Sequence, residues 1–223
     1  MEILLHLLLS QCCIQSFRNQ ESPASTRGSG YFERVDMKID KDWVSAYFDH
    51  GIDVLNRRVF IGDIDHASVD AAIKGMYLME TEDPDTRVEL FISSYGGEVY
   101  DAIALHDIIH TLKCPVHTFA YGKCMSAAPL LLASGAPGHR WVAPHTFFMH
   151  HDGASEMEGK TTFLRAEMKH FDVLDKAWTE LLAGYSNKTF KWWDDRSKRS
   201  GDFYFSADEA IEWGLADSIW SER

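Results

Sequence analysis

Residues 116–133, VHTFAYGKCMSAAPLLLA, change their hydrophobic period within a few positions and so decide the fold class. The first part, 116–121, follows the two-residue period of a strand. The last part, from about Ser126 to Ala133, is predicted to be a helix. The residues GKCM at 122–125 connect the two. A strand that leads through a short connection into a helix is one βα unit of an α/β fold.

The same unit occurs twice before this stretch. A strand is predicted over 58–64, and the helix after it carries an apolar stripe from Val69 to Met79. A second strand, VELFIS at 88–93, is followed by the Gly96-Gly97 turn and by a helix over roughly 99–112. Repeated βα units predict a parallel sheet with helices packed on it.

The pattern after this stretch predicts two further strands, near 140–143 and 146–150, and then a helix of about 25 residues that starts near Glu158. Its apolar positions step by threes and fours and are interrupted at Asp175. This stripe fits a helix that covers its own core as well as one that contacts another copy. Residues 206–209 form a predicted capping box before a last short helix.

Composition bounds the class of protein. The chain has 223 residues, 45% of them hydrophobic, and a formal net charge of -12. Such a charge repels phosphate backbones and anionic lipid, so we expect no nucleic acid and no membrane partner, although an acidic surface is also common on ordinary globular proteins. The four cysteines match neither a disulfide framework nor a zinc motif. A reducing, cytoplasmic location is therefore expected.

The first 36 residues differ from the rest. Residues 3–9 are apolar but too short to span a bilayer, and Glu2 stands where a secretory signal carries cations. Residues 18–30 are polar and rich in helix breakers. We therefore expect residues 1–36 to be a disordered extension or a propeptide, or an upstream extension of a chain that naturally starts at Met37, and residues 37–223 to be one folded domain.

Ligands of open α/β sheets bind at the carboxyl ends of the strands, which directs attention to two loops. The Gly96-Gly97 pair permits positive φ and leaves backbone N–H groups free to face a substrate. Ser126 stands where a strand turns into a helix, so unpaired N–H groups would face charge that develops beside its hydroxyl. An ordinary helix N-cap is the simpler interpretation of such a serine.

A serine nucleophile needs a neighbouring base. Among the eleven histidines, His150 and His151 close a predicted strand beside the Ser126 loop. With Asp152 they could also form a metal cluster, but adjacent strand residues point to opposite faces and no HExxH frame is present. The pattern alone therefore predicts an α/β domain with a plausible hydrolase elbow and no metal.

Residues 48–220 resemble the ClpP peptidase family. The resemblance rests on four motifs that occur in the family's order: METEDP (79–84) with VELFISSYGG (88–97), GKCMSAAPLLLASG (122–135), PHTFFMHH (144–151), and GDFYFSA (201–207) with WGLAD (213–217). It implies a ClpP/crotonase-like α/β fold of repeated βα units with a protruding handle helix, and thus a ClpP-like peptidase domain over 37–223.

The resemblance also implies the roles of individual residues. Ser126 would be the nucleophile, His151 rather than His150 the general base, and Asp202 the carboxylate that orients the histidine. Gly97 and Ala127 would supply the N–H groups of an oxyanion hole. The reaction would be the hydrolysis of peptide bonds by a serine endopeptidase.

The family resemblance extends to assembly and partners. It implies a homo-oligomer of heptameric rings, possibly stacked as a tetradecamer, that encloses the sites and degrades unfolded polypeptides. A separate Clp-type ATPase unfoldase would bind the ATP, so no cofactor is expected in this chain, and no GxxxxGK[ST] motif occurs in it. The helix from about Glu158 would be the handle.

Several positions depart from the family pattern. Tyr95 stands where a proline is usual, residues 123–125 replace glutamine and small residues, residues 127–129 replace Met-Gly-Ala, and Gly201 replaces an arginine that commonly joins the two rings. Other interpretations remain open beside the Clp subunit. They are a viral head-maturation peptidase of the same fold, a catalytically silent ring subunit, and a relative of enoyl-CoA hydratase, which needs no serine nucleophile.

Overall fold

The structure is a computed structural model that describes residues 47–154 and 156–220. The predicted extension at 1–36 lies outside these residues. The described chain forms an eight-stranded mixed sheet with helices packed on it, so the predicted α/β fold of repeated βα units is confirmed. No helix within the described residues is long and apolar enough to cross a membrane.

The sheet is mostly parallel and divides at its longest strand. Four strands pair in parallel in the order β2 (Arg58–Ile61), β3 (Val88–Ser94), β4 (Val116–Met125) and β5 (Arg140–Val142), with β8 (Ser218–Ile219) beyond β5. The short β1 (Ile52–Asp53) lies antiparallel to β2. The last residues of β4 pair instead with β6 (Phe147–His150), and β6 pairs antiparallel with β7 (Phe203–Ser206). The end of β4 thus lies between two groups of strands.

The prediction that residues 122–125 form a connection outside the sheet is wrong. These residues continue β4 in the sheet, because Lys123, Cys124 and Met125 pair with residues 147–149 of β6. The glycine at 122, with φ of 66°, accompanies a register shift against β3. The chain therefore forms a bulged strand where the glycine suggested a turn.

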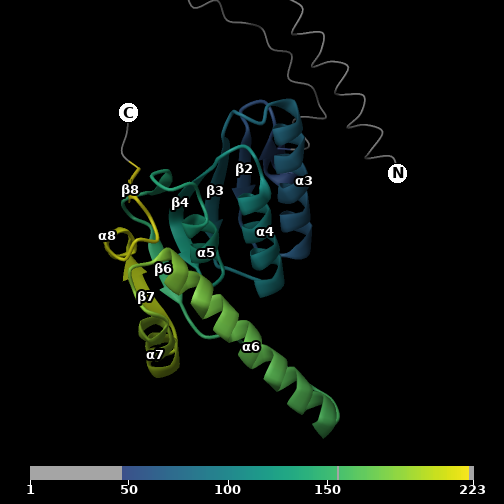
Figure 1. The fold of residues 1–223 in the computed structure, drawn as a ribbon, viewed down its shortest axis with the longest axis vertical. Helices are drawn as coiled ribbons and strands as arrows, with labels where there is room; N and C mark the ends of the chain where they lie inside the picture. The colour runs from purple at the N-terminus through teal and green to yellow at the C-terminus, as the bar shows by residue number, and fades with distance from the viewer. Residues whose placement is uncertain (1–46, 155, 221–223) are drawn as a thin grey trace, which may run out of the picture. The chain divides into compact units, whose positions relative to one another are not determined.

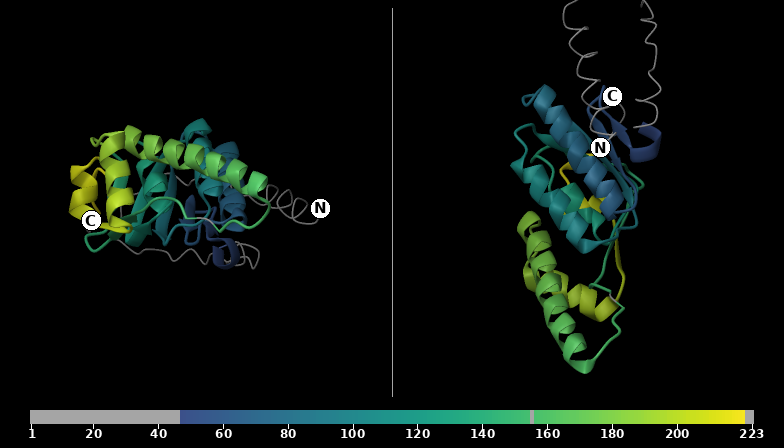
Figure 2. Two further views of the ribbon diagram at one scale, coloured as in Figure 1. Left: turned by 90° about the horizontal axis from the view of Figure 1, so that it is seen from below. Right: turned by 90° about the vertical axis from the view of Figure 1, so that its right-hand side faces the viewer.

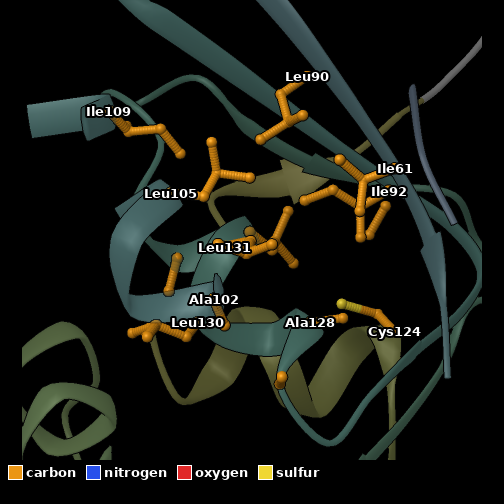
Figure 3. Packing of buried hydrophobic residues seen from close by; sticks show 14 of the residues in the cluster. Ile61, Leu90, Ile92, Ala102, Leu105, Ile109, Cys124, Ala128, Leu130 and Leu131 are labelled. Atoms are coloured by element: carbon orange, nitrogen blue, oxygen red, sulfur yellow. The ribbon is translucent and has the colours of Figure 1, made fainter. Parts of the chain in front are cut away.

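One face of the sheet is covered by α3 (His66–Glu82), α4 (Val99–Thr111) and α5 (Ala128–Ala133) (Figures 1 and 2). Leu90 and Ile92 from β3 meet Leu105 of α4 and Leu131 of α5 in this layer, and all four are fully buried (Figure 3). Each such side chain contributes about 1.5–3 kcal/mol on burial. This packing holds the ends of β3 and β4, which carry the candidate site.

The other face of the central strands carries a row of stacked aromatic rings. Phe60, Phe91, Phe119 and Trp141 come from four adjacent strands, with ring centroids 5.0, 4.7 and 4.8 Å apart along the row. Aromatic pairs in this arrangement add to the energy of burial. The row ties the parallel strands together on the side opposite the helices.

The handle predicted from the long helix is present as α6 (Thr161–Tyr185), of 25 residues. Its buried residues, Trp178, Thr179 and Leu182, all lie in its C-terminal part, and its N-terminal part extends away from the sheet (Figure 1). The helix α7 (Phe190–Ser200) packs back on α6, and α8 (Ala207–Glu212) follows β7. The predicted capping box is confirmed, because the Glu209 N–H donates a hydrogen bond to Ser206 Oγ and the Ser206 N–H donates one to Glu209 Oε2.

Candidate active site

Ser126 occupies a sharp turn between β4 and α5. Its φ is +54°, a left-handed conformation that among the described non-glycine residues only Arg57 shares. Such a backbone costs roughly 1–3 kcal/mol and persists where the surroundings enforce it. Here the Ser126 N–H donates a hydrogen bond to the carbonyl oxygen of Met149 at 2.8 Å. The turn therefore sets the serine at the junction of β4 and β6.

The predicted helix start at Ser126 is wrong by two residues. The helix α5 begins at Ala128, with Ala127 as the N-cap residue. Ser126 therefore does not cap the helix, and its hydroxyl is free for another contact. The reason is the left-handed turn, which ends the strand one residue before the helical geometry begins.

The hydroxyl of Ser126 meets His151. Ser126 Oγ and His151 Nε2 lie 2.7 Å apart, which is hydrogen-bond distance. The pairing of the two strands explains the contact. β4 and β6 lie parallel, with Met125 opposite Met149. Ser126 directly follows β4 and His151 directly follows β6, so both side chains stand at the same end of the two strands. The structure thus brings together the serine and the histidine that the family resemblance pairs.

The neighbouring His150 points into the protein instead. Only 2% of it is exposed, its ring lies edge-on to Trp193 with centroids 5.1 Å apart, and neither ring nitrogen has a hydrogen-bond partner among the described residues. Burial, followed by the charge of His151, lowers the pKa of His150 to about 4. His150 is therefore a neutral core residue at pH 7 and cannot reach Ser126.

Asp202 lies beside the opposite edge of His151. The antiparallel register pairs His150 with Phe203, which places Asp202 opposite His151. The distance from Asp202 Oδ1 to His151 Nδ1 is 3.8 Å, with 55% of the Asp202 side chain exposed. This is an ion-pair distance for a protonated histidine but too long for a hydrogen bond. The hydroxyl of Tyr204 also approaches Asp202 Oδ2, at 3.4 Å.

The two glycines of the β3 loop approach the serine closely. A Cβ on Gly96 would lie 2.5 Å from the Cβ of Ser126, and one on Gly97 would lie 2.0 Å from the carbonyl oxygen of Ile64. Both have positive φ, at 103° and 149°. Within the described residues, the N–H groups of Gly97 and Ala127 make no hydrogen bond. Both groups therefore remain available to a ligand.

A cleft of about 430 Å³ contains Ser126 and His151. Its far wall is the side of α6 that carries Phe171, Leu174 and Trp178. A second cavity, of about 480 Å³, lies beside it and is lined by residues that include Tyr95, Lys123 and Met125. The Lys123 ammonium lies 4.1 Å from the centre of the Tyr95 ring. Three of the positions that depart from the family pattern, Tyr95, Lys123 and Met125, therefore shape this cavity.

In the described part of the chain, no three His, Cys, Asp or Glu side chains gather closely enough to hold a metal ion. Cys114 and Cys124 are buried free thiols. Burial raises the pKa of Cys124 well above its usual value, which makes it a poor nucleophile at neutral pH although it lies only two residues from Ser126.

Sequence reasoning alone found Ser126 but did not find the wall formed by α6. The long apolar stripe indicated a covered face, yet its partner was left open between the domain's own core and another copy. The structure shows that part of this face lines the cleft.

A comparison with protein-family models matches residues 48–223 to the family described as Clp protease.

Proposed function

Because the chain belongs to the Clp protease family and is thus a peptidase of the ClpP type, we propose that it is a serine endopeptidase with Ser126 as nucleophile, His151 as general base and Asp202 as the orienting carboxylate. The 2.7 Å contact between Ser126 Oγ and His151 Nε2 carries the proposal. A serine hydroxyl becomes a useful nucleophile when a base stands at this distance.

The chemistry follows from these positions. The Ser126 hydroxyl attacks the peptide carbonyl while His151 Nε2 takes its proton and then delivers that proton to the leaving amine. The free N–H groups of Gly97 and Ala127 are the donors for the oxyanion. Water, deprotonated by His151, then releases the acyl group. Asp202 stabilises the imidazolium that forms in each half-reaction.

We further propose that the protein is the proteolytic subunit of an ATP-dependent Clp protease in the cytoplasm. Heptameric rings, singly or as a tetradecamer, would enclose the sites, and a Clp-type unfoldase that binds ATP would supply unfolded polypeptides. Support for self-association comes from α6, on which Phe163, Met168 and Val173 are at least half exposed. Exposed apolar side chains along a protruding helix offer surface for contact with another copy.

A fluorophosphonate probe tests the nucleophile, because only an activated serine reacts with it quickly. We expect one adduct by intact mass on the wild-type protein and on Ser218→Ala, which removes an exposed serine on β8, and none on Ser126→Ala. An adduct on Ser126→Ala would assign the nucleophile elsewhere. No adduct on the assembled wild-type protein would favour the silent ring subunit, against which the contact between Ser126 and His151 now argues.

A further inference from the structure

The wall of the cleft contains one side chain that its apolar surroundings do not explain. Glu167, Phe171, Leu174 and Trp178 follow one another on α6 at steps of four, three and four, so they form a single stripe. All four line the cleft that holds Ser126 and His151. A glutamate thus stands at the outer end of an otherwise apolar stripe that faces the catalytic centre.

The stripe is fixed close to the catalytic histidine. Gly153 lies two residues after His151, and a Cβ on it would come within 2.5 Å of the Phe171 ring, which shows how closely the ring covers the backbone there. The Gly153 N–H also donates a hydrogen bond to Asp175 Oδ1 at 3.3 Å. The segment after His151 and the inner part of the stripe therefore form one side of the cleft.

Glu167 has no counter-charge. It is half-buried, and it makes no hydrogen bond or ion pair with any described residue. No lysine or arginine lines the cleft in the described part of the chain. A partly buried carboxylate that has no charged partner gains an ion pair when a cation binds beside it.

The other carboxylates of the cleft are placed differently. Asp175 accepts the bond from Gly153, and the charges of Asp175 and Asp152 both act on Lys198, whose pKa is raised chiefly by its hydrogen bond to Asp194. Glu98 is an exposed residue at the start of α4. Among these carboxylates, only Glu167 combines partial burial, a place in the apolar stripe and the lack of a hydrogen bond or ion pair with a described residue.

We propose that Glu167 makes the cleft selective for a lysine or arginine side chain on the acyl side of the scissile bond. The aliphatic stem of such a side chain would lie on Phe171 and Leu174, and its cationic head would reach the carboxylate. A norleucine or leucine side chain fills the apolar wall equally well but leaves Glu167 unpaired. This inference rests on the proposed peptidase function.

The test uses pairs of internally quenched peptides that differ only by lysine or norleucine at one of the three acyl-side positions. Norleucine keeps the length and apolar stem of lysine and removes the ammonium group. At one of these positions we expect kcat/KM for lysine to exceed that for norleucine by about five- to tenfold, the range of a partly exposed ion pair with one charged hydrogen bond. Glu167→Gln should reduce the ratio to about one, and Glu167→Lys should invert it.

Two controls separate this inference from the proposed function. Glu180→Gln removes an exposed carboxylate from the same helix outside the cleft and should keep the lysine preference. Cleavage of norleucine peptides and labelling of Ser126, measured on the wild-type protein and on Glu180→Gln, report the peptidase itself. Equal rates for lysine and norleucine at all three positions, or a lysine preference that persists in Glu167→Gln, would overturn the role of Glu167 while leaving the peptidase intact. If the wild-type protein shows neither cleavage nor labelling, the proposed function is rejected and this inference is rejected with it.

Discussion

Replacing Asp202 by asparagine should lower kcat without unfolding the protein. The structure sets the size of the effect, because the carboxylate lies 3.8 Å from His151 Nδ1 and more than half of it is exposed. Two unit charges at this separation interact by about 1 kcal/mol in a water-like medium and by about 4 kcal/mol at an effective dielectric constant near 20. Loss of that stabilisation of the imidazolium corresponds to a decrease in kcat of about fivefold to a thousandfold.

The assay is steady-state hydrolysis of a fluorogenic peptide at pH 7–8, with thermal unfolding measured in parallel. Asp208→Asn is a matched control, because it removes an exposed carboxylate from α8, the helix that follows β7. It should leave kcat within about twofold, as surface substitutions usually do. An unchanged kcat in Asp202→Asn would show that Asp202 does not act on His151. A fall greater than about 10⁴ would show instead that the carboxylate moves into a buried hydrogen bond when substrate binds.

Two further substitutions test the surroundings of Ser126 and His151. His150→Phe should make folding less sensitive to acid. The pKa of His150 is about 4 in the folded protein and near 6.5 in the unfolded chain, so the unfolded chain binds more protons between these pH values. The free energy of unfolding of the wild-type protein therefore falls by about 3 kcal/mol as the pH drops from 6.5 to 4. Urea unfolding at pH 7 and pH 4.5 would show this, and an equal loss in wild type and variant would contradict it. Gly97→Ala should abolish peptidase activity and destabilise the fold by more than about 2 kcal/mol, because the added Cβ would overlap the Ile64 carbonyl oxygen. The control is Gly62→Ala, whose added Cβ meets nothing within 4 Å. This variant should behave as wild type in the same activity and unfolding measurements.

The elements that the sequence predicted well are those with a strong hydrophobic period. The strand at 88–94 and the helix from Val99 differ from the expected bounds by one residue at most, and the 25-residue helix was expected at its observed length. The helix α7 was missed because FKWWDDRSKRS is mostly charged and shows no long apolar stripe. It is held by aromatic packing instead, with Trp192 and Trp193 against Trp213 at 4.8 and 5.9 Å between ring centroids.

The choice between His150 and His151 shows what a sequence cannot supply. Alternation along a strand implies that the two side chains point to opposite faces of the sheet. Which of the two points toward Ser126 depends on how β6 pairs with β4 and β7. The pairing of β6 with β7 also places Asp202, although β7 was not predicted as a strand. Family resemblance supplied the choice that periodicity could not make.

The local departures from ordinary folding rules gather around this one pair of side chains. Ser126 has a left-handed backbone, Gly97 passes closer to Ile64 than any side chain would allow, and His150 is buried with both ring nitrogens unpaired. Each of these features costs stability. Sequences keep such costs where a fixed geometry is needed, so their convergence within the ends of β3, β4 and β6 is an argument for catalysis there that does not depend on the family match. Glu167 is a fourth such departure, on the opposite wall of the same cleft, which is why we look for its partner in the substrate.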